Sequence, residues 1–120
     1  MSNVTIAQNQ LLQIASTDDL LTGNAVYTSD IVYVAGNSRI IGMVFSDQSS
    51  AASGLVIEQA QNSADFASGY VTRSTQSYTG SAVTSNTFNI TIVAPFARIS
   101  YTNGATPQGV FRFTASAISQ

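Results

Sequence analysis

The chain has 120 residues, 44% of them hydrophobic, and a formal net charge of −2, so it is long enough for one domain with a core of its own. Only 8% of the residues are charged, against about 25% in ordinary soluble proteins. The four arginines are scattered, which argues against nucleic-acid binding, and the absence of cysteine and histidine removes thiolate metal sites and the commonest catalytic base.

Neutral hydrogen-bonding side chains take the place of charge. The chain contains 17 Ser, 13 Thr, 8 Asn and 9 Gln, together 47 residues, and no lysine. Protein interfaces tend to exclude Lys and Glu from their centres, so this composition favours a surface that packs against other protein. An acidic secreted bacterial domain would show the same bias.

The N-terminus predicts a polar arm over residues 1–10, which could run along a neighbouring subunit or exchange with it, followed by one domain over residues 11–120. The stretch "MSNVTIAQNQLLQIAS" has neither a positive region nor an apolar core, so we expect no signal peptide. No apolar run approaches the roughly 18 residues of a membrane span, and we expect no membrane segment.

The first half of the chain predicts strands separated by turn signals. Leu11–Ala15 is expected to be a strand. "AVYTSDIVYVAG" has Ile31 and Tyr33 on one face and Val32 and Val34 on the other, which is typical of a strand with little solvent access. Arg39–Ser46 has the same pattern, and Gly42 within it indicates a bulge or a close backbone approach.

The second half continues in the same manner. Gly54–Ala60 predicts a strand, and "IEQAQNSADFAS" is interpreted as strand then loop rather than helix. Gly69–Gly80 predicts an exposed polar strand. Asn86–Val93 alternates strictly, with Phe88, Ile90 and Ile92 directed inward, and Pro95 predicts a corner or a change of sheet.

The segment Val93–Phe113 is expected to be a hairpin. Ala97, Ile99 and Tyr101 share an inward face, as do Phe111, Phe113 and Ala115 on the return strand. Arg98 and Arg112 should then face the same way on adjacent strands. Asn103-Gly104 favours a turn, and the link to Gln108, stiffened by Pro107, predicts an exposed tip.

Seven or eight short strands at this spacing indicate an all-β protein, an antiparallel β-sandwich of jelly-roll-like type in a single domain.

Catalysis would have to use the six carboxylates, since no histidine or cysteine is present. A glycosidase needs two acids about 5–10 Å apart, but Glu58 is expected to face outward, and Asp18 and Asp19 are typical of turn caps. Asp18, Asp19 and Asp30 could converge on calcium, yet no calcium-loop motif is present. We therefore expect no enzyme, no cofactor and no metal site.

Two tyrosines are carbohydrate-site candidates. Tyr70 and Tyr78 are eight residues apart, and an unbroken strand would place them on one face as a stacking platform for sugars. The competing interpretation is packing beneath a loop or against another subunit, and the absence of tryptophan weakens the sugar interpretation.

Three stretches, "RIIGMVFSDQ", "GLVIEQAQNSADF" and "VAPFARISYTNGATPQGVFRF", resemble small β-sandwich structural proteins of bacteriophage virions, of the capsid-decoration or head-fibre type. The loop "AQNSADF" departs from the Gly turn and Trp expected there. The resemblance implies a virion role and a symmetric assembly. With no catalytic residues and no signal peptide, we expect a non-catalytic virion subunit that is assembled in the host cytoplasm, contacts other capsid proteins and forms a homo-oligomer, a trimer or another closed ring.

The surface that would serve such assembly is predicted from the same segment. The interface candidates are Arg98, Arg112, Asn103, Gly104, Pro107 and Gln108, although the two arginines could instead simply solvate an outer face. Two alternative functions stay open, a carbohydrate-binding module that uses Tyr70 and Tyr78, and a cell-surface fibre subunit.

Overall fold

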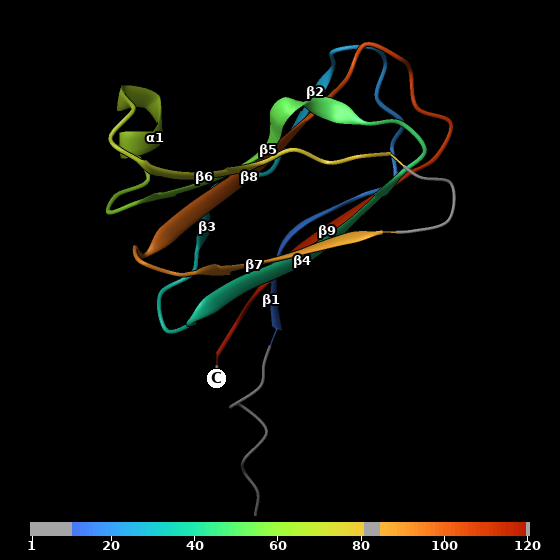
Figure 1. Ribbon diagram of the computed structural model, residues 1–120. Helices are drawn as coiled ribbons and strands as arrows, with labels where there is room; N and C mark the ends of the chain where they lie inside the picture. Colours follow the sequence, from blue (N-terminus) through green and yellow to red (C-terminus); the bar gives the residue numbers. More distant parts are fainter. Residues whose placement is uncertain (1–10, 81–84, 120) are drawn as a thin grey trace, which may run out of the picture.

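The computed structural model describes residues 11–80 and 85–119, and the predicted arm over residues 1–10 lies outside them. The described chain folds into two antiparallel sheets that face each other (Figure 1). Its elements are β1 (Leu11–Thr17), β2 (Val26–Thr28), β3 (Val32–Tyr33), β4 (Arg39–Ser46), β5 (Ser50–Ala60), α1 (Asp65–Ser68), β6 (Thr72–Gln76), β7 (Asn86–Thr91), β8 (Phe96–Asn103) and β9 (Phe111–Ile118).

The strand order confirms the all-β sandwich and its jelly-roll character. Sheet I has the order β1-β9-β4-β7, and sheet II has the order β2-β8-β5-β6, with β3 also paired to β8. When the two-residue strand β3 is set aside, eight strands remain, and the first pairs with the last, the second with the seventh, the third with the sixth and the fourth with the fifth. This nested antiparallel pairing of eight strands in two sheets is that of a jelly roll.

The segment around β2 and β3 differs from its prediction. It forms two short strands rather than one, and only one of its faces is covered, because Val34 is fully buried whereas Tyr33 is 61% exposed and Ile31 is also exposed. Tyr33 lies instead on the sheet surface, with its ring edge-on to Phe96 at 5.1 Å. The prediction that this segment is buried on both faces, which was based on its apolar residues on each side, is therefore wrong.

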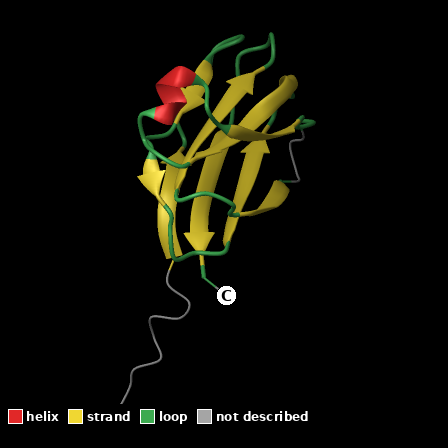
Figure 2. Cartoon of the chain, turned by 90° about the vertical axis from the view of Figure 1, so that its left-hand side faces the viewer, coloured by secondary structure: helices red, strands yellow, loops and turns green. Residues whose placement is uncertain are grey.

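One short helix interrupts the strands (Figure 2). The segment after β5 was expected to be loop, but α1 forms a single turn over four residues that buries Phe66. It ends at Gly69, which adopts a left-handed φ of 79°, a conformation that glycine takes without steric cost.

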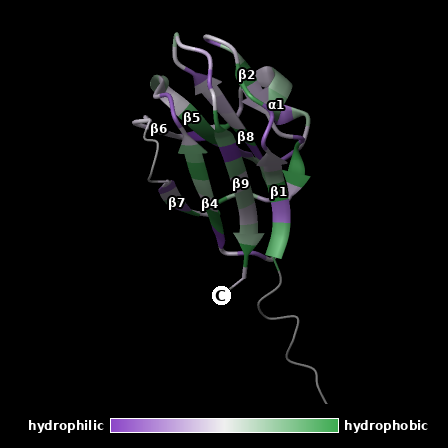
Figure 3. Cartoon of the chain, turned by 90° about the vertical axis from the view of Figure 1, so that its right-hand side faces the viewer, coloured by the Kyte–Doolittle hydropathy of each residue, from purple (hydrophilic) through white to green (hydrophobic). Residues whose placement is uncertain are grey.

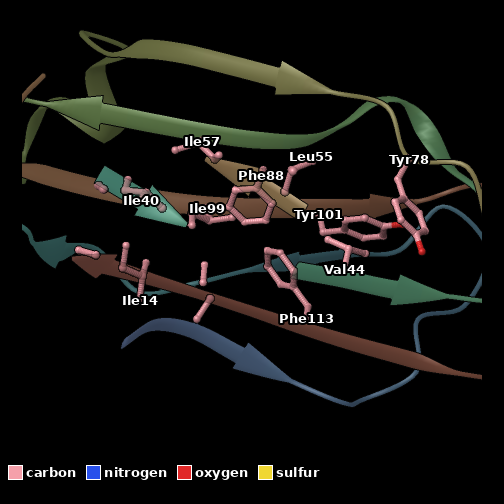
Figure 4. Packing of buried hydrophobic residues seen from close by; sticks show 14 of the residues in the cluster. Ile14, Ile40, Val44, Leu55, Ile57, Tyr78, Phe88, Ile99, Tyr101 and Phe113 are labelled. Atoms are coloured by element: carbon pink, nitrogen blue, oxygen red, sulfur yellow. The ribbon is translucent and has the colours of Figure 1, made fainter. Parts of the chain in front are cut away.

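The core lies between the two sheets and is centred on aromatic rings. Tyr101 of β8 is fully buried, and its ring centroid lies 5.1 Å from that of Phe111 and 6.0 Å from that of Phe113, both on β9. Figure 4 shows Tyr101 and Phe113 directed toward each other from opposite sheets. Around them pack aliphatic and further aromatic side chains, namely Ile14, Val34, Ile40, Val44, Leu55, Ile57, Tyr78, Phe88 and Ile99.

The predicted hairpin is wrong, because β8 and β9 do not pair with each other. The strand β8 belongs to sheet II and β9 to sheet I, so the chain crosses from one sheet to the other between residues 103 and 111. The inward faces were correctly predicted, but they face each other across the core instead of lying side by side. The change of sheet predicted at Pro95 is confirmed, since β7 and β8 also belong to different sheets.

Gly42 occupies a place where the sheet and the core approach closely, as its position in the strand predicted. A Cβ atom on Gly42 would lie 2.1 Å from the ring of Phe88 and 2.6 Å from the carbonyl oxygen of Thr114. The absent side chain lets the Phe88 ring lie against the inner surface of β4.

Candidate interaction surfaces

A charged cluster lies on the outer surface of sheet II. Glu58 of β5 pairs with Arg98 of the neighbouring strand β8 through a bond of 2.7 Å and with Arg73 of β6 through one of 2.8 Å. Glu58 is on the outer face as expected, but only 8% of the residue is exposed, because its neighbours cover it. It is therefore an ion-paired structural group rather than a solvated one.

The short helix completes this cover. The guanidinium of Arg98 lies 5.1 Å from the centre of the Phe66 ring, a cation–π contact. Burial acts to raise the pKa of Glu58, but the hydrogen bonds and charges of Arg98 and Arg73 outweigh it, and its pKa lies below the usual value. Arg98, an interface candidate from the sequence, thus has its charge neutralised within the chain.

Arg112 lies on the opposite side of the molecule. It is exposed on the outer face of sheet I, opposite Phe45 of β4, and it lines a shallow hollow of about 400 Å³ with Asp18 and Thr114. The prediction that Arg98 and Arg112 face the same way on adjacent strands is wrong, since it depended on the hairpin.

The predicted tip over residues 103–108 has exposed residues at 105–107, but it is fixed to the rest of the chain by two buried side chains, Asn103 and Gln108. Asn103 is fully buried, and its side-chain nitrogen donates to the carbonyl oxygens of Leu21, Thr22 and Thr106 at 2.8–3.3 Å. Gln108 is 6% exposed and accepts a hydrogen bond of 2.8 Å from the amide of Leu21. These two amides hold the crossing between the sheets to the β1–β2 loop, so they are not available to a neighbour.

The other two candidates in this link differ from each other. Gly104 donates its amide to the Ser49 carbonyl at 3.1 Å, and a Cβ there would lie 2.6 Å from the same oxygen, so its role is close packing. Pro107 is exposed. Of the four tip residues, Pro107 alone keeps an accessible side chain for the predicted contact.

The two tyrosine candidates for sugar binding are separated by the fold. Tyr70 precedes β6 and is 73% exposed, whereas Tyr78 follows β6 and is 4% exposed. The ring of Tyr78 packs edge-on to Tyr101 at 6.4 Å, and its hydroxyl accepts a hydrogen bond from the Ser46 amide at 3.3 Å. The paired platform is therefore wrong, because the strand ends at Gln76 and the chain then turns into the core.

Tyr70 nevertheless borders a hollow of about 350 Å³ between the loops that flank β6 and β8. The lining includes Gln61 and Thr72, which are exposed, and Val93, which is 64% exposed. An exposed aromatic ring beside neutral polar groups is the kind of surface that binds sugars.

The outer face of sheet I carries a different surface, which no sequence motif indicated. A hollow of about 390 Å³ crosses β1, β9, β4 and β7, and its lining includes Leu11, Ile41, Met43, Thr87 and Thr114. Met43 is 48% exposed and Leu11 is 66% exposed. Figure 3 is viewed from this side and shows green, hydrophobic segments on β1 and β4. We call this surface the sheet I face.

Two charged residues lie at the ends of β4 on this face. Arg39 donates hydrogen bonds to the side chains of Asn89 and Thr91 on β7. Asp47 accepts hydrogen bonds from the amides of Gly109 and Val110 at 2.9–3.1 Å, and these bonds hold the pKa of Asp47 below its usual value. In the described part of the chain the structure shows ion pairs at Glu58 only, so the charges of Arg39 and Asp47 are not neutralised there.

Within residues 11–80 and 85–119, no group of three or more acidic side chains lies close enough together to hold a metal ion. In the same residues, no helix has the length and apolar character needed to cross a membrane.

Comparison with known proteins identifies the family. The model of the family described as "Uncharacterised protein YqxG N-terminal domain" matches residues 1–118, which is nearly the whole chain. The chain belongs to this family. No curated protein matches it.

A solved structure supports the fold of this YqxG N-terminal domain. The structure titled "Crystal structure of PBSX exported protein XepA" superposes with a TM-score of 0.66 at 16% sequence identity. The match covers 99% of this chain and 40% of the XepA chain, so this chain spans less than half the length of that neighbour. At this identity the likeness shows the shared sandwich fold.

Proposed function

We propose that this YqxG N-terminal domain is a non-catalytic structural subunit of a phage particle, a jelly-roll sandwich that associates with copies of itself and with other capsid proteins. The resemblance of three segments to virion β-sandwich proteins supports this role. The chain also shares its sandwich fold with the PBSX exported protein XepA. The role requires no cofactor, nucleic acid or membrane, and it places the protein in the virion after assembly in the host cytoplasm.

The observation that carries the proposal is the sheet I face. On the outer side of sheet II, Arg73 and Arg98 pair with Glu58, and Phe66 of the short helix packs against Arg98. On sheet I, Met43 and Leu11 are exposed beside a hollow whose lining, within the residues that the structure describes, contains no charged residue. Exposed apolar surface bordered by neutral polar groups is typical of a protein–protein contact.

The test is the mass of the full chain in solution and in particles. Light scattering over a range of concentrations should give a discrete oligomer, such as a trimer or another closed ring. Particles purified from cells that express the chain together with a phage shell should contain it at a fixed ratio to the shell protein. A monomer at the highest concentration, absent from such particles, would refute the proposal.

A second candidate function rests on the hollow at Tyr70. An exposed tyrosine beside Gln61 and Thr72 would suit a neutral oligosaccharide, which stacks on the ring and bonds to the amide. Affinity electrophoresis in gels that contain neutral polysaccharides should then retard the wild-type chain and not Tyr70→Ala. Tyr33→Ala is the matched control, because Tyr33 is similarly exposed at 61% but does not line this hollow. Equal mobility of all three chains would remove this candidate.

A further inference from the structure

The sheet I face has a regular arrangement that the strand register makes explicit. The core-facing residues of β4 and β9 alternate with residues on the outer side. The outer positions pair across the two strands as Arg39 with Ile118, Ile41 with Ser116, Met43 with Thr114, and Phe45 with Arg112. The ladder continues by one step, since the Asp47 amide donates to the Val110 carbonyl at 3.4 Å. In the middle of the face, β4 and β9 therefore present two columns of five residues side by side.

The outer residues of β4 are complementary to the same residues of a second copy that runs in the opposite direction. Arg39 and Asp47 have opposite charge and each lies four residues from Met43, and Ile41 and Phe45 each lie two residues from it. If a second copy is laid over this column in the reverse direction, centred on Met43, Arg39 meets Asp47, Ile41 meets Phe45, and Met43 meets its own counterpart. Every contact in that column then joins opposite charges or two apolar groups.

The β9 column gives the same result independently. Reversal about Thr114 places Ile118 opposite Val110 of the second copy, Ser116 opposite Arg112, and Thr114 opposite itself. Ile118 is half-buried and Val110 is 40% exposed, so both have apolar surface left to bury. Arg112, an interface candidate from the sequence, would meet a hydroxyl group that can accept its hydrogen bonds.

We infer that the sheet I face is a two-fold contact with a second copy of this chain, in which β4 lies antiparallel over β4 and β9 over β9, centred on Met43 and Thr114. The inference rests on the proposed function, because it names the surface through which self-association occurs. The other face-to-face two-fold arrangement has its axis along the strands and lays β4 over the antiparallel strand β9 of the second copy, which places Arg39 on Ile118 and Phe45 on Arg112. It loses both the charge pairs and the apolar pairs.

The dimensions are compatible with this contact. Facing sheets pack about 10 Å apart, and the hollow of about 390 Å³ beside Met43 gives the partner's methionine space to enter. A twist of about 30° between facing sheets shifts Arg39 sideways from Asp47 by about 7 Å, because each lies roughly 13 Å from the centre. The long arginine side chain can span that offset.

The area indicates a weak to moderate contact. Four strands about 4.8 Å apart, each about 26 Å long, present roughly 500 Å² per copy, so the pair buries near the lower limit of about 1,000 Å² for a specific interface.

A two-fold contact also requires an even number of subunits. The expected trimer would therefore become a hexamer of three pairs.

The register can be tested by cross-linking, because the natural chain has no cysteine. Single-cysteine variants of the full chain are treated with a short bismaleimide. Met43→Cys and Thr114→Cys, on the two-fold axis, should each give cross-linked dimers. The control is Thr75→Cys, an exposed residue of β6 on sheet II, which should stay uncross-linked.

A mixed experiment distinguishes this arrangement from the one that lays β4 over β9. Ile118→Cys and Val110→Cys should each stay uncross-linked alone, because identical positions would lie roughly 26 Å apart along the strands. An equimolar mixture should give a heterodimer that contains both. Cross-linking of Ile118→Cys to itself, without the mixed product, would overturn the inference.

A charge at the centre gives a second measurement. Met43→Glu places two carboxylates against each other and should weaken association about 100-fold, whereas Thr75→Glu should leave it unchanged, with both chains folded by circular dichroism. If the wild-type chain assembles but Met43→Glu assembles equally well, this face is wrong and the proposed self-association stands. If the wild-type chain is a monomer at all concentrations, both proposals fail.

Discussion

Removal of one hydroxyl group from the core should stabilise this protein. Tyr101 is fully buried, and its hydroxyl oxygen has no hydrogen-bond partner among the described residues. A buried polar group without a partner costs roughly 1–3 kcal/mol of desolvation. The ring itself is well packed between Phe111 and Phe113, so Tyr101→Phe keeps the packing and removes the cost.

We expect Tyr101→Phe to raise the free energy of unfolding by about 1 kcal/mol, which corresponds to an increase of about 4 °C in Tm for a domain of this size. Urea and thermal denaturation followed by circular dichroism measure both. The matched control is Tyr78→Phe, because the Tyr78 hydroxyl accepts a hydrogen bond from the Ser46 amide. The free energy of unfolding of that variant should be about 1 kcal/mol lower than that of the wild-type chain.

The same hydroxyl predicts an alkaline effect. Burial, and then the charge of Tyr78, raise the pKa of Tyr101 well above its usual value of 10.0. Above about pH 10 the unfolded chain releases a proton that the folded chain keeps, so this residue lowers stability by about 1.4 kcal/mol per pH unit. Below pH 10 it has no effect. Tyr101→Phe should lack this part of the alkaline loss.

Two results would contradict this reasoning. A loss of more than about 1 kcal/mol in Tyr101→Phe would show that the hydroxyl is hydrogen-bonded after all. An unchanged alkaline slope in that variant would show that Tyr101 does not titrate with unfolding.

Three further substitutions test the structural roles described above, each by urea denaturation. Glu58→Gln removes the charge that faces Arg98 and should cost about 2 kcal/mol at pH 7. Because the pKa of Glu58 is lowered, the wild-type advantage should disappear as the pH falls below about 4.5. Gly42→Ala should cost at least about 2 kcal/mol through its clash with Phe88, partly recovered by adding Phe88→Leu. Asn103→Asp keeps the size of the side chain but loses the donor to three carbonyl groups, and should cost about 2–3 kcal/mol; a loss under 0.5 kcal/mol would remove its role in the crossing.

The strands were predictable from sequence because their signal is local. The period-2 alternation of Asn86–Val93 and of residues 97–101 depends only on neighbouring side chains, and their inward faces are as expected. Gly42 was likewise predictable, because a glycine within a strand of branched residues indicates that something approaches the backbone closely.

Pairing was less predictable, because it depends on distant residues. An Asn-Gly turn between two alternating segments fits a hairpin, and it fits equally two strands that face each other across a sandwich. The link over residues 104–110 was the available signal, since a tight hairpin needs only two residues. The burial of Asn103 and Gln108 requires partners from the β1–β2 loop, about 80 positions away in the chain, and no local pattern indicates that contact.

The tyrosine pair failed for a related reason. Spacing places two residues on one face only while the strand continues, and β6 ends at Gln76. Tyr78 then enters the core, where Tyr101 offers an aromatic contact, whereas Tyr70 stays on the surface. Each of the two interpretations of the tyrosines, burial against other residues and exposure as a sugar platform, was assigned to both residues together. In the fold, Tyr78 is buried and Tyr70 is exposed.

The two outer faces of the sandwich account for where assembly should occur. On sheet II, Glu58 is the only acidic residue of β5 and is shared between Arg73 and Arg98, and the Phe66 ring lies against the Arg98 guanidinium. The charge of Arg98 is therefore neutralised within the chain, and a partner would gain little from it. On sheet I, Arg39 and Asp47 lie at opposite ends of one strand, too far apart to neutralise each other, and Met43 lies midway between them. A second copy in reverse orientation places its Asp47 opposite Arg39 and its Arg39 opposite Asp47, and it covers Met43 at the same time. We therefore propose that the chain associates with itself through the sheet I face, which includes Arg39, and not through the surface around Arg98.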